Sequence, residues 1–152
     1  MTDRGLDHPY FALPPPWLIA HRGGSLLAPE NTLAAFERAE ALGADVIETD
    51  VRLSRDGEVM VFHDGGTLRI TAVPGTIERR RRVELEMLDA GFTFTPDGGR
   101  TYPWRGKGIR IPTLAVVLAR FPRLRFNIEA KGKEPALADA ARSPALLLLA
   151  GV

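Results

Sequence analysis

The sequence contains no cysteine among its 152 residues, which excludes disulfides, thiolate metal ligands and a cysteine nucleophile. An excess of charge of one sign is also missing, because 20 lysines and arginines against 19 aspartates and glutamates leave a formal net charge of +1. Such a balance produces no overall field that would attract nucleic acid or an anionic membrane. Any anion that the protein binds must be held by local groups.

Long hydrophobic runs are absent as well. The last apolar run, at 146–152, is far shorter than the roughly 20 residues that a membrane-spanning helix requires. The first sixteen residues combine acidic side chains with scattered prolines and have no continuous apolar segment, unlike a signal peptide. The composition, 45% hydrophobic and 26% charged, is typical of a globular domain. We therefore expect a cytoplasmic protein without a membrane span.

Short apolar segments and helical patterns alternate along the chain. Four segments have the length and composition of buried strands: 17–20, 46–51, 59–63 and 125–129. Apolar residues at helical spacing predict helices at 33–42, 82–88 and 112–121, with a last one from Pro135. This alternation predicts an α/β fold with a parallel sheet and right-handed crossovers, either doubly wound or closed into a barrel.

Local signals mark the ends of several elements. Asn31 is expected to be the N-cap of the first helix, and Gly43 the residue that ends it. A tight turn at 54–57 joins the second and third expected strands. The segments 64–76 and 93–110 are rich in glycine and are expected to be long loops, which in compact domains are commonly functional or mobile.

Three carboxylates lie on two of the expected strands. Glu48 and Asp50 are two residues apart on the second strand, so they point to the same face of the sheet. Two like charges on one buried face are costly, and a hard cation between them would offset that cost. Glu129 on the fourth strand offers a third carboxylate. Oxygen ligands of this kind suit Mg²⁺ or Ca²⁺ better than zinc.

Ionisable residues also follow the other two expected strands. His21 and Arg22 come after the first strand, and His63 ends the third. All four strands therefore carry polar groups at their carboxyl ends, where parallel α/β sheets and barrels form their active sites. The histidines could move protons and the arginine could hold phosphate through its two-pronged guanidinium. With the carboxylates, this set indicates metal-assisted phosphoryl chemistry.

These runs resemble the glycerophosphodiester phosphodiesterase family in order and spacing. The matching runs are 19–24 (Ile-Ala-His-Arg-Gly-Gly), 28–32 (Ala-Pro-Glu-Asn-Thr), 47–50 (Ile-Glu-Thr-Asp), 61–64 (Val-Phe-His-Asp), 111–114 (Ile-Pro-Thr-Leu) and 126–131 (Phe-Asn-Ile-Glu-Ala-Lys). The resemblance implies a TIM-type barrel and hydrolysis of glycerophosphodiesters, small-molecule substrates, to glycerol 3-phosphate and an alcohol. It also implies a divalent metal cofactor, Mg²⁺ or Ca²⁺, bound by Glu48, Asp50 and Glu129.

The same resemblance implies roles for the other polar residues. His21 and His63 match the general acid and base, and the sequence leaves open which is which. Arg22 matches the arginine that binds phosphate, and Lys131 stands where the family has a lysine near the substrate. Asn31 is expected to brace its loop rather than contact the substrate. The alcohol of the substrate and the choice between the two metals are also left open.

Length sets this chain apart from the family pattern. A complete (β/α)₈ barrel takes ~250 residues, whereas the sequence ends after the fourth expected strand and its helix. We therefore expect an irregular leader at 1–16 and, at 17–152, the N-terminal half of a barrel, truncated after about four strands. The alternatives are an active enzyme, a catalytically inactive remnant, or a half barrel that associates with a copy of itself through its open edges.

A basic run at 79–82 offers a different interpretation, a patch for nucleic acid. No aromatic platform accompanies it, and the total charge is close to zero. We therefore expect a solvated start of a helix there and no nucleic-acid partner.

Overall fold

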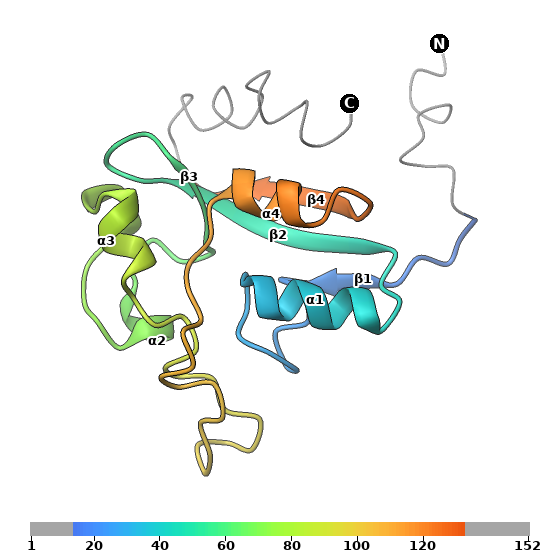
Figure 1. Cartoon of the computed structure of the whole chain (residues 1–152), viewed down its shortest axis with the longest axis horizontal. Coiled ribbons are helices and arrows are strands. Elements are labelled where there is room, and N and C mark those ends of the chain that lie inside the picture. The colour runs from blue at the N-terminus through green and yellow to red at the C-terminus, as the bar shows by residue number, and fades with distance from the viewer. Residues whose placement is uncertain (1–13, 133–152) are drawn as a thin grey trace.

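The structure is a computed structural model, and it describes residues 14–132 (Figure 1). Residues 1–13 of the expected leader and the helix expected from Pro135 lie outside the described residues. Between residues 14 and 132, no helix combines the length and the hydropathy that crossing a membrane would demand.

The sheet is organised around one long strand, β2 (Val46–Leu53). The first strand, β1 (Ile19–His21), pairs with β2 in parallel, with His21 opposite Glu48. Strand β4 (Arg125–Ala130) pairs in parallel along the other edge of β2, with Asp50 opposite Glu129. The order β1-β2-β4 therefore forms three neighbouring parallel strands, as the alternation of strands and helices predicted.

The third strand departs from the prediction of a wholly parallel sheet. Strand β3 (Val59–Val61) pairs with the end of β2 in antiparallel fashion, with Val51 opposite Val61. The connection at 54–58 is a tight turn, and a connection this short can join only antiparallel neighbours, because a parallel pair needs a crossover of a dozen residues or more. The expectation of four parallel strands was therefore wrong for this strand.

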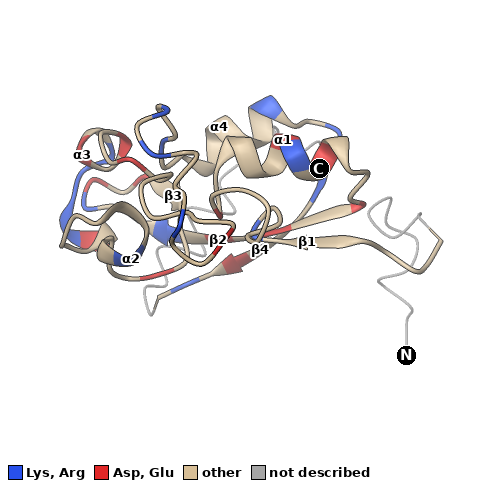
Figure 2. Cartoon of the chain, turned by 90° about the horizontal axis from the view of Figure 1, so that it is seen from below, with Lys and Arg blue, Asp and Glu red and all other residues tan. Residues whose placement is uncertain are grey.

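Two helices cover one face of the sheet (Figure 2): α1 (Leu33–Ala41) and α4 (Leu114–Arg120). Helix α1 is capped by Thr32, whose side chain accepts a hydrogen bond from the backbone N of Ala35, so the prediction of Asn31 as N-cap was wrong by one residue. Gly43 follows the helix with φ of +78°, as expected for a residue that ends it. Helix α4 is capped in the same way by Thr113.

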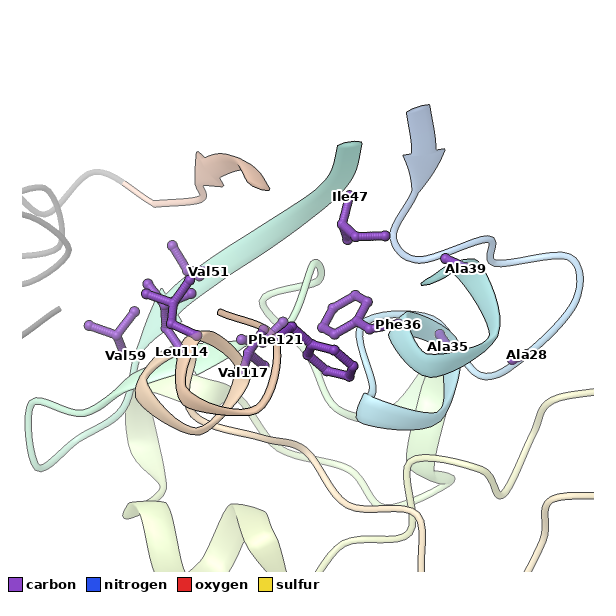
Figure 3. Packing of buried hydrophobic residues seen from close by; sticks show 12 residues of the cluster. Ala28, Ala35, Phe36, Ala39, Ile47, Val51, Val59, Leu114, Val117 and Phe121 are labelled. Atoms are coloured by element: carbon purple, nitrogen blue, oxygen red, sulfur yellow. The ribbon is translucent and has the colours of Figure 1, made fainter. Parts of the chain in front are cut away.

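The main core lies between these helices and the sheet (Figure 3). Phe36 of α1 meets Phe121 edge-on, with ring centroids 6.1 Å apart, and Phe126 of β4 in the same manner at 5.9 Å. Ile47 and Val51 of β2 are buried on this side. Because side chains alternate along a strand, Glu48 and Asp50 point to the opposite side of β2, as the sequence predicted.

A second part of the chain leaves the sheet after β3 and returns to it at α4. It contains α2 (Leu68–Thr71), a 3₁₀ turn η2 (Ile77–Arg79) and α3 (Arg82–Glu86), which pack around a second hydrophobic core. The neck of this excursion is closed, because Val61 N donates a hydrogen bond to Pro112 O at 2.9 Å. The expected loop at 93–110 contains neither helix nor strand, whereas α2 lies inside the expected loop at 64–76.

Candidate active site

Asp50 is the most deeply buried carboxylate of the predicted site, with 1% of its side chain exposed. Asn31 Nδ2 donates to Asp50 Oδ2 at 3.0 Å, and Asn31 Oδ1 accepts from the Thr49 hydroxyl at 2.7 Å. The backbone N of Asn31 donates to Arg22 O at 3.0 Å, and its φ is +57°. Asn31 thus joins the loop after β1 to β2, and this agrees with the prediction that it braces the loop.

Three carboxylates gather where β2 and β4 run side by side. Glu48, Asp50 and Glu129 each offer one oxygen, and these oxygens lie within 4.8 Å of one another. The register explains the cluster, because Asp50 and Glu129 are direct neighbours across parallel strands and Glu48 shares their face. An all-oxygen donor set of this kind fits a hard divalent cation such as Mg²⁺ or Ca²⁺.

Lys131 places a positive charge against this cluster. Its Nζ lies 2.6 Å from Glu129 Oε1 and 3.5 Å from Asp50 Oδ1. The hydrogen bond from Lys131 holds the pKa of Glu129 below its usual range, with smaller contributions from the charges of His63 and Arg22. The same hydrogen bond raises the pKa of Lys131. Lys131 therefore balances part of the negative charge of the three carboxylates.

His21 and Arg22 reach the cluster from the end of β1. His21 Nε2 lies 3.9 Å from Glu48 Oε2, and its side chain is 65% exposed. The backbone N of Arg22 donates to the same Glu48 oxygen at 3.0 Å. The turn that follows needs a glycine, because Gly23 has φ of +78° and a Cβ there would lie 2.6 Å from the Phe36 ring.

The Arg22 side chain lies between two carboxylates. Its Nη1 is 3.0 Å from Glu30 Oε1, and its Nε is 3.5 Å from Asp50 Oδ2. This Nε is buried and makes no hydrogen bond within residues 14–132. The nearest anion to this Nε is the Asp50 carboxylate, so Glu30 and Asp50 together hold the guanidinium in place.

His63 follows β3, which pairs with β2 on the same edge as β1, and the hairpin explains how it reaches the site. Strand β3 runs back along β2, and Phe62 N donates to Asp50 O at 2.9 Å, which brings the end of β3 to the level of Asp50. His63 Nδ1 lies 2.7 Å from Asp64 Oδ1, and Arg52 Nε donates to His63 O at 2.8 Å. His63 therefore follows an antiparallel strand, not the end of a parallel one.

The structure brings all seven predicted residues to one region of the fold, together with three that sequence reasoning missed. Glu30 and Asp64 are the neighbours of Arg22 and His63, and Arg69 contacts both of these carboxylates. The sequence carried a signal for two of the three, because Glu30 belongs to the run at 28–32 and Asp64 is next to His63. No sequence prediction named Arg69, and its contacts with Glu30 and Asp64 across space reveal it.

Comparison with known proteins agrees with this fold and site. Residues 21–144 match the model of the glycerophosphoryl diester phosphodiesterase family, and the chain belongs to this family. A glycerophosphodiester phosphodiesterase of Caldanaerobacter subterraneus is 44% identical over 116 residues, which are 75% of this chain and 44% of that protein. A human lysophospholipase D is 37% identical over 117 residues, covering 74% of this chain and 35% of that protein.

Solved structures give the same result for the fold. The glycerophosphoryl diester phosphodiesterase domain of a Mycobacterium tuberculosis protein matches with a TM-score of 0.76 at 28% identity, over 84% of this chain and 48% of that one. An Oleispira antarctica phosphodiesterase in complex with the product sn-glycerol-3-phosphate matches with a TM-score of 0.66 at 31% identity, over 89% and 61%. These neighbours are TIM-barrel enzymes, so the described sheet is part of such a barrel, as predicted. The chain spans less than half the length of the curated relatives cited above.

Proposed function

We propose that this protein takes part in the hydrolysis of glycerophosphodiesters to glycerol 3-phosphate and an alcohol. The observation that carries the proposal is the meeting of three carboxylates within 4.8 Å, beside an imidazole and a buried guanidinium edge. The relative from Oleispira antarctica, whose structure holds sn-glycerol-3-phosphate as product, supports the choice of substrate class.

In this proposal Glu48, Asp50 and Glu129 hold the divalent cation, Mg²⁺ or Ca²⁺. When bound, such an ion polarises a phosphoryl oxygen and stabilises the negative charge of the transition state. Arg22, held between Glu30 and Asp50, supplies its guanidinium charge to the phosphate. Lys131, whose Nζ lies against Glu129 and Asp50, supplies a second positive charge to the same phosphate.

The two imidazoles move the protons. One of His21 and His63 accepts the proton of the attacking oxygen, which is the neighbouring glycerol hydroxyl, as its bond to phosphorus forms. The other gives a proton to the alcohol oxygen as its bond to phosphorus breaks. This step leaves a cyclic phosphate on the glycerol. Water then opens this ring, and the two imidazoles exchange roles. His21 lies next to Glu48 and His63 arrives over Asp50, so the two reach the carboxylate cluster from different strands.

The test is the release of glycerol 3-phosphate from glycerophosphocholine by the purified chain with Mg²⁺ or Ca²⁺. We expect release that EDTA abolishes and that Glu48→Gln lowers by about 100-fold or more. Glu37→Gln is the matched control, because Glu37 pairs with Arg120 on the outer helices. No release with either metal, or equal rates for the two variants, would contradict the proposal.

In a second candidate function, the same hydrolysis requires the chain to associate with a copy of itself. Among residues 14–132, the outer strands β1 and β4 pair only with β2, and each therefore has an open edge. Leu18 and Ile19 are about half exposed near the open edge of β1. Open edges and exposed apolar side chains promote pairing with another chain. Sedimentation combined with the hydrolysis assay tests this candidate. An active monomer would exclude it. A chain that is inactive in every state of association would favour an inactive remnant.

A further inference from the structure

Arg69 of α2 holds two carboxylates at once. Its Nε and Nη2 donate to the two oxygens of Asp64 at 2.6 and 3.1 Å. Its Nη1 and Nη2 donate to the two oxygens of Glu30 at 3.0 and 2.6 Å. Both contacts are two-pronged, which is the strongest arrangement that a guanidinium makes with a carboxylate.

Each of these carboxylates also contacts a residue of the proposed active site. Glu30 Oε1 accepts from Arg22 Nη1 at 3.0 Å. Asp64 Oδ1 lies 2.7 Å from His63 Nδ1. A continuous series of charged contacts therefore connects Arg22 to His63. It passes through Glu30, Arg69 and Asp64.

Both carboxylates of this series, Glu30 and Asp64, are ionised at neutral pH. The hydrogen bond from Arg69 lowers the pKa of Asp64 to about 2, against the opposing effect of burial. Burial raises the pKa of Glu30, but the hydrogen bond and charge of Arg69 and the charge of Arg22 outweigh it and leave this pKa below its usual value. Asp64 is therefore a carboxylate that can only accept a hydrogen bond.

The acceptor that contacts Nδ1 decides which ring nitrogen of a neutral His63 carries the proton. A neutral His63 that donates from Nδ1 to Asp64 has its lone pair on Nε2, the nitrogen on the opposite side of the ring. In that form Nε2 can accept a proton, which a general base requires, and after protonation it can return one.

A contact from Thr93 to the backbone of α2 also helps to fix the position of Arg69. The Thr93 hydroxyl donates to Arg69 O at 2.7 Å and to Ile70 O at 2.9 Å. Helix α2 is thereby tied to Thr93, and this contact helps to hold Arg69 beside Glu30 and Asp64. A simple structural tie between α2 and the barrel would use the same contacts, so the test must read out the imidazole and not stability alone.

We propose that Arg69 is a positioning residue that acts through Glu30 on Arg22 and through Asp64 on His63, and that it fixes His63 with the proton on Nδ1 and Nε2 facing the reaction. This inference rests on the roles proposed above for Arg22 and His63. It adds that the excursion carrying α2 sets the geometry of the site on the barrel.

Nitrogen NMR of the histidine rings tests the proposal directly, above pH ~8 where an ordinary imidazole is neutral. The chain has three histidines, so His8→Gln and His21→Gln assign the signals. We expect His63 to carry its proton on Nδ1 in the unaltered chain and to change mainly to Nε2 in Arg69→Gln. Arg120→Gln is the matched control, because it removes an exposed arginine that pairs with Glu37, and it should leave the tautomer unchanged.

Two results would overturn the proposal: His63 protonated on Nε2 in the unaltered chain, or the Nδ1 form kept in Arg69→Gln. If Arg69→Gln does not fold, Arg69→Lys decides, since a lysine lacks the fork that spans both carboxylates and should weaken the Nδ1 preference. Hydrolysis gives an independent readout, with kcat expected to fall about 10- to 100-fold and KM to change less. An unaltered chain without hydrolytic activity would defeat the proposed function and leave the tautomer result intact.

Discussion

Asn31 Nδ2 donates a hydrogen bond to Asp50 Oδ2 at 3.0 Å, in a place where both side chains are almost fully buried. This contact joins the loop after β1 to the centre of the sheet. It also explains why Thr32 caps α1, since the Asn31 side chain is engaged with β2 and its backbone has turned to a left-handed φ.

The first prediction concerns this contact. Asn31→Ala removes the hydrogen bond that Asp50 Oδ2 accepts and the acceptor of the Thr49 hydroxyl, and it puts an alanine at positive φ. We expect the free energy of unfolding to fall by about 2–4 kcal/mol, measured by urea denaturation. Asn127→Ala on exposed β4 is the control and should change it by less than about 0.5 kcal/mol. Equal effects of the two substitutions would contradict the assignment.

The second prediction concerns the close approach of the β1 loop to α1. Gly23→Ala would place a Cβ 2.6 Å from the Phe36 ring and 2.9 Å from Ala35 Cβ. We expect a loss of about 2–4 kcal/mol in the free energy of unfolding. Gly57→Ala also has positive φ but meets no atom within 4 Å, so it should cost only about 1–2 kcal/mol of backbone strain. The difference between the two variants isolates the steric part, and a difference near zero would show that the loop yields.

The third prediction concerns acid stability. The folded-state pKa of Asp64 is about 2, below its usual value of 3.8, chiefly because Arg69 donates to it. The ionised carboxylate therefore stabilises the fold above pH ~4, and this contribution is lost as the pH falls towards 2. After allowance for solvent screening, we expect about 1 kcal/mol. Asp64→Asn and Arg69→Gln should both show a shallower loss of stability between pH ~5 and ~2 than the unaltered chain. Parallel curves would oppose this account.

The fourth prediction concerns the metal. Mg²⁺ or Ca²⁺ at 10 to 100 times its dissociation constant should stabilise the fold by about 1–3 kcal/mol and raise the melting temperature. Glu129→Gln should remove most of this effect without unfolding the chain, because the Glu129 side chain is 59% exposed. Sodium chloride at the same ionic strength controls for screening. Stabilisation that survives in Glu129→Gln would argue against a shared site.

Much of the fold could be predicted because its signals are local. Alternating apolar residues marked β2, and the same alternation placed Glu48 and Asp50 on one face. The spacing of apolar residues and Gly43 marked α1. The barrel class came from six runs of sequence, and the family comparison confirms it. The catalytic and metal-binding roles of the seven residues stay predictions, as does the cytoplasmic location.

The sequence did not reveal the direction of one strand and two contacts between distant segments. The direction of β3 was decided by the short turn at 54–58, which the rhythm of strands and helices obscured. Arg69 lies 39 residues from Glu30, and no periodicity links the two. Asn31 looked like a helix cap because caps and buried amides draw on the same residue type. For Arg69 and Asn31 the deciding partner was close in space and remote in the chain.

The closed neck between β3 and α4 has a consequence for variation in this protein. Met60 and Thr113 form a bridge there, next to the hydrogen bond from Val61 to Pro112, so the chain leaves and re-enters the sheet at one point. Lengthening or shortening the segment between them costs little entropy and displaces neither α4 nor β4. Changes of length in the part of this segment beyond Thr93, which holds none of the proposed site residues, should therefore leave the strands and the site in place.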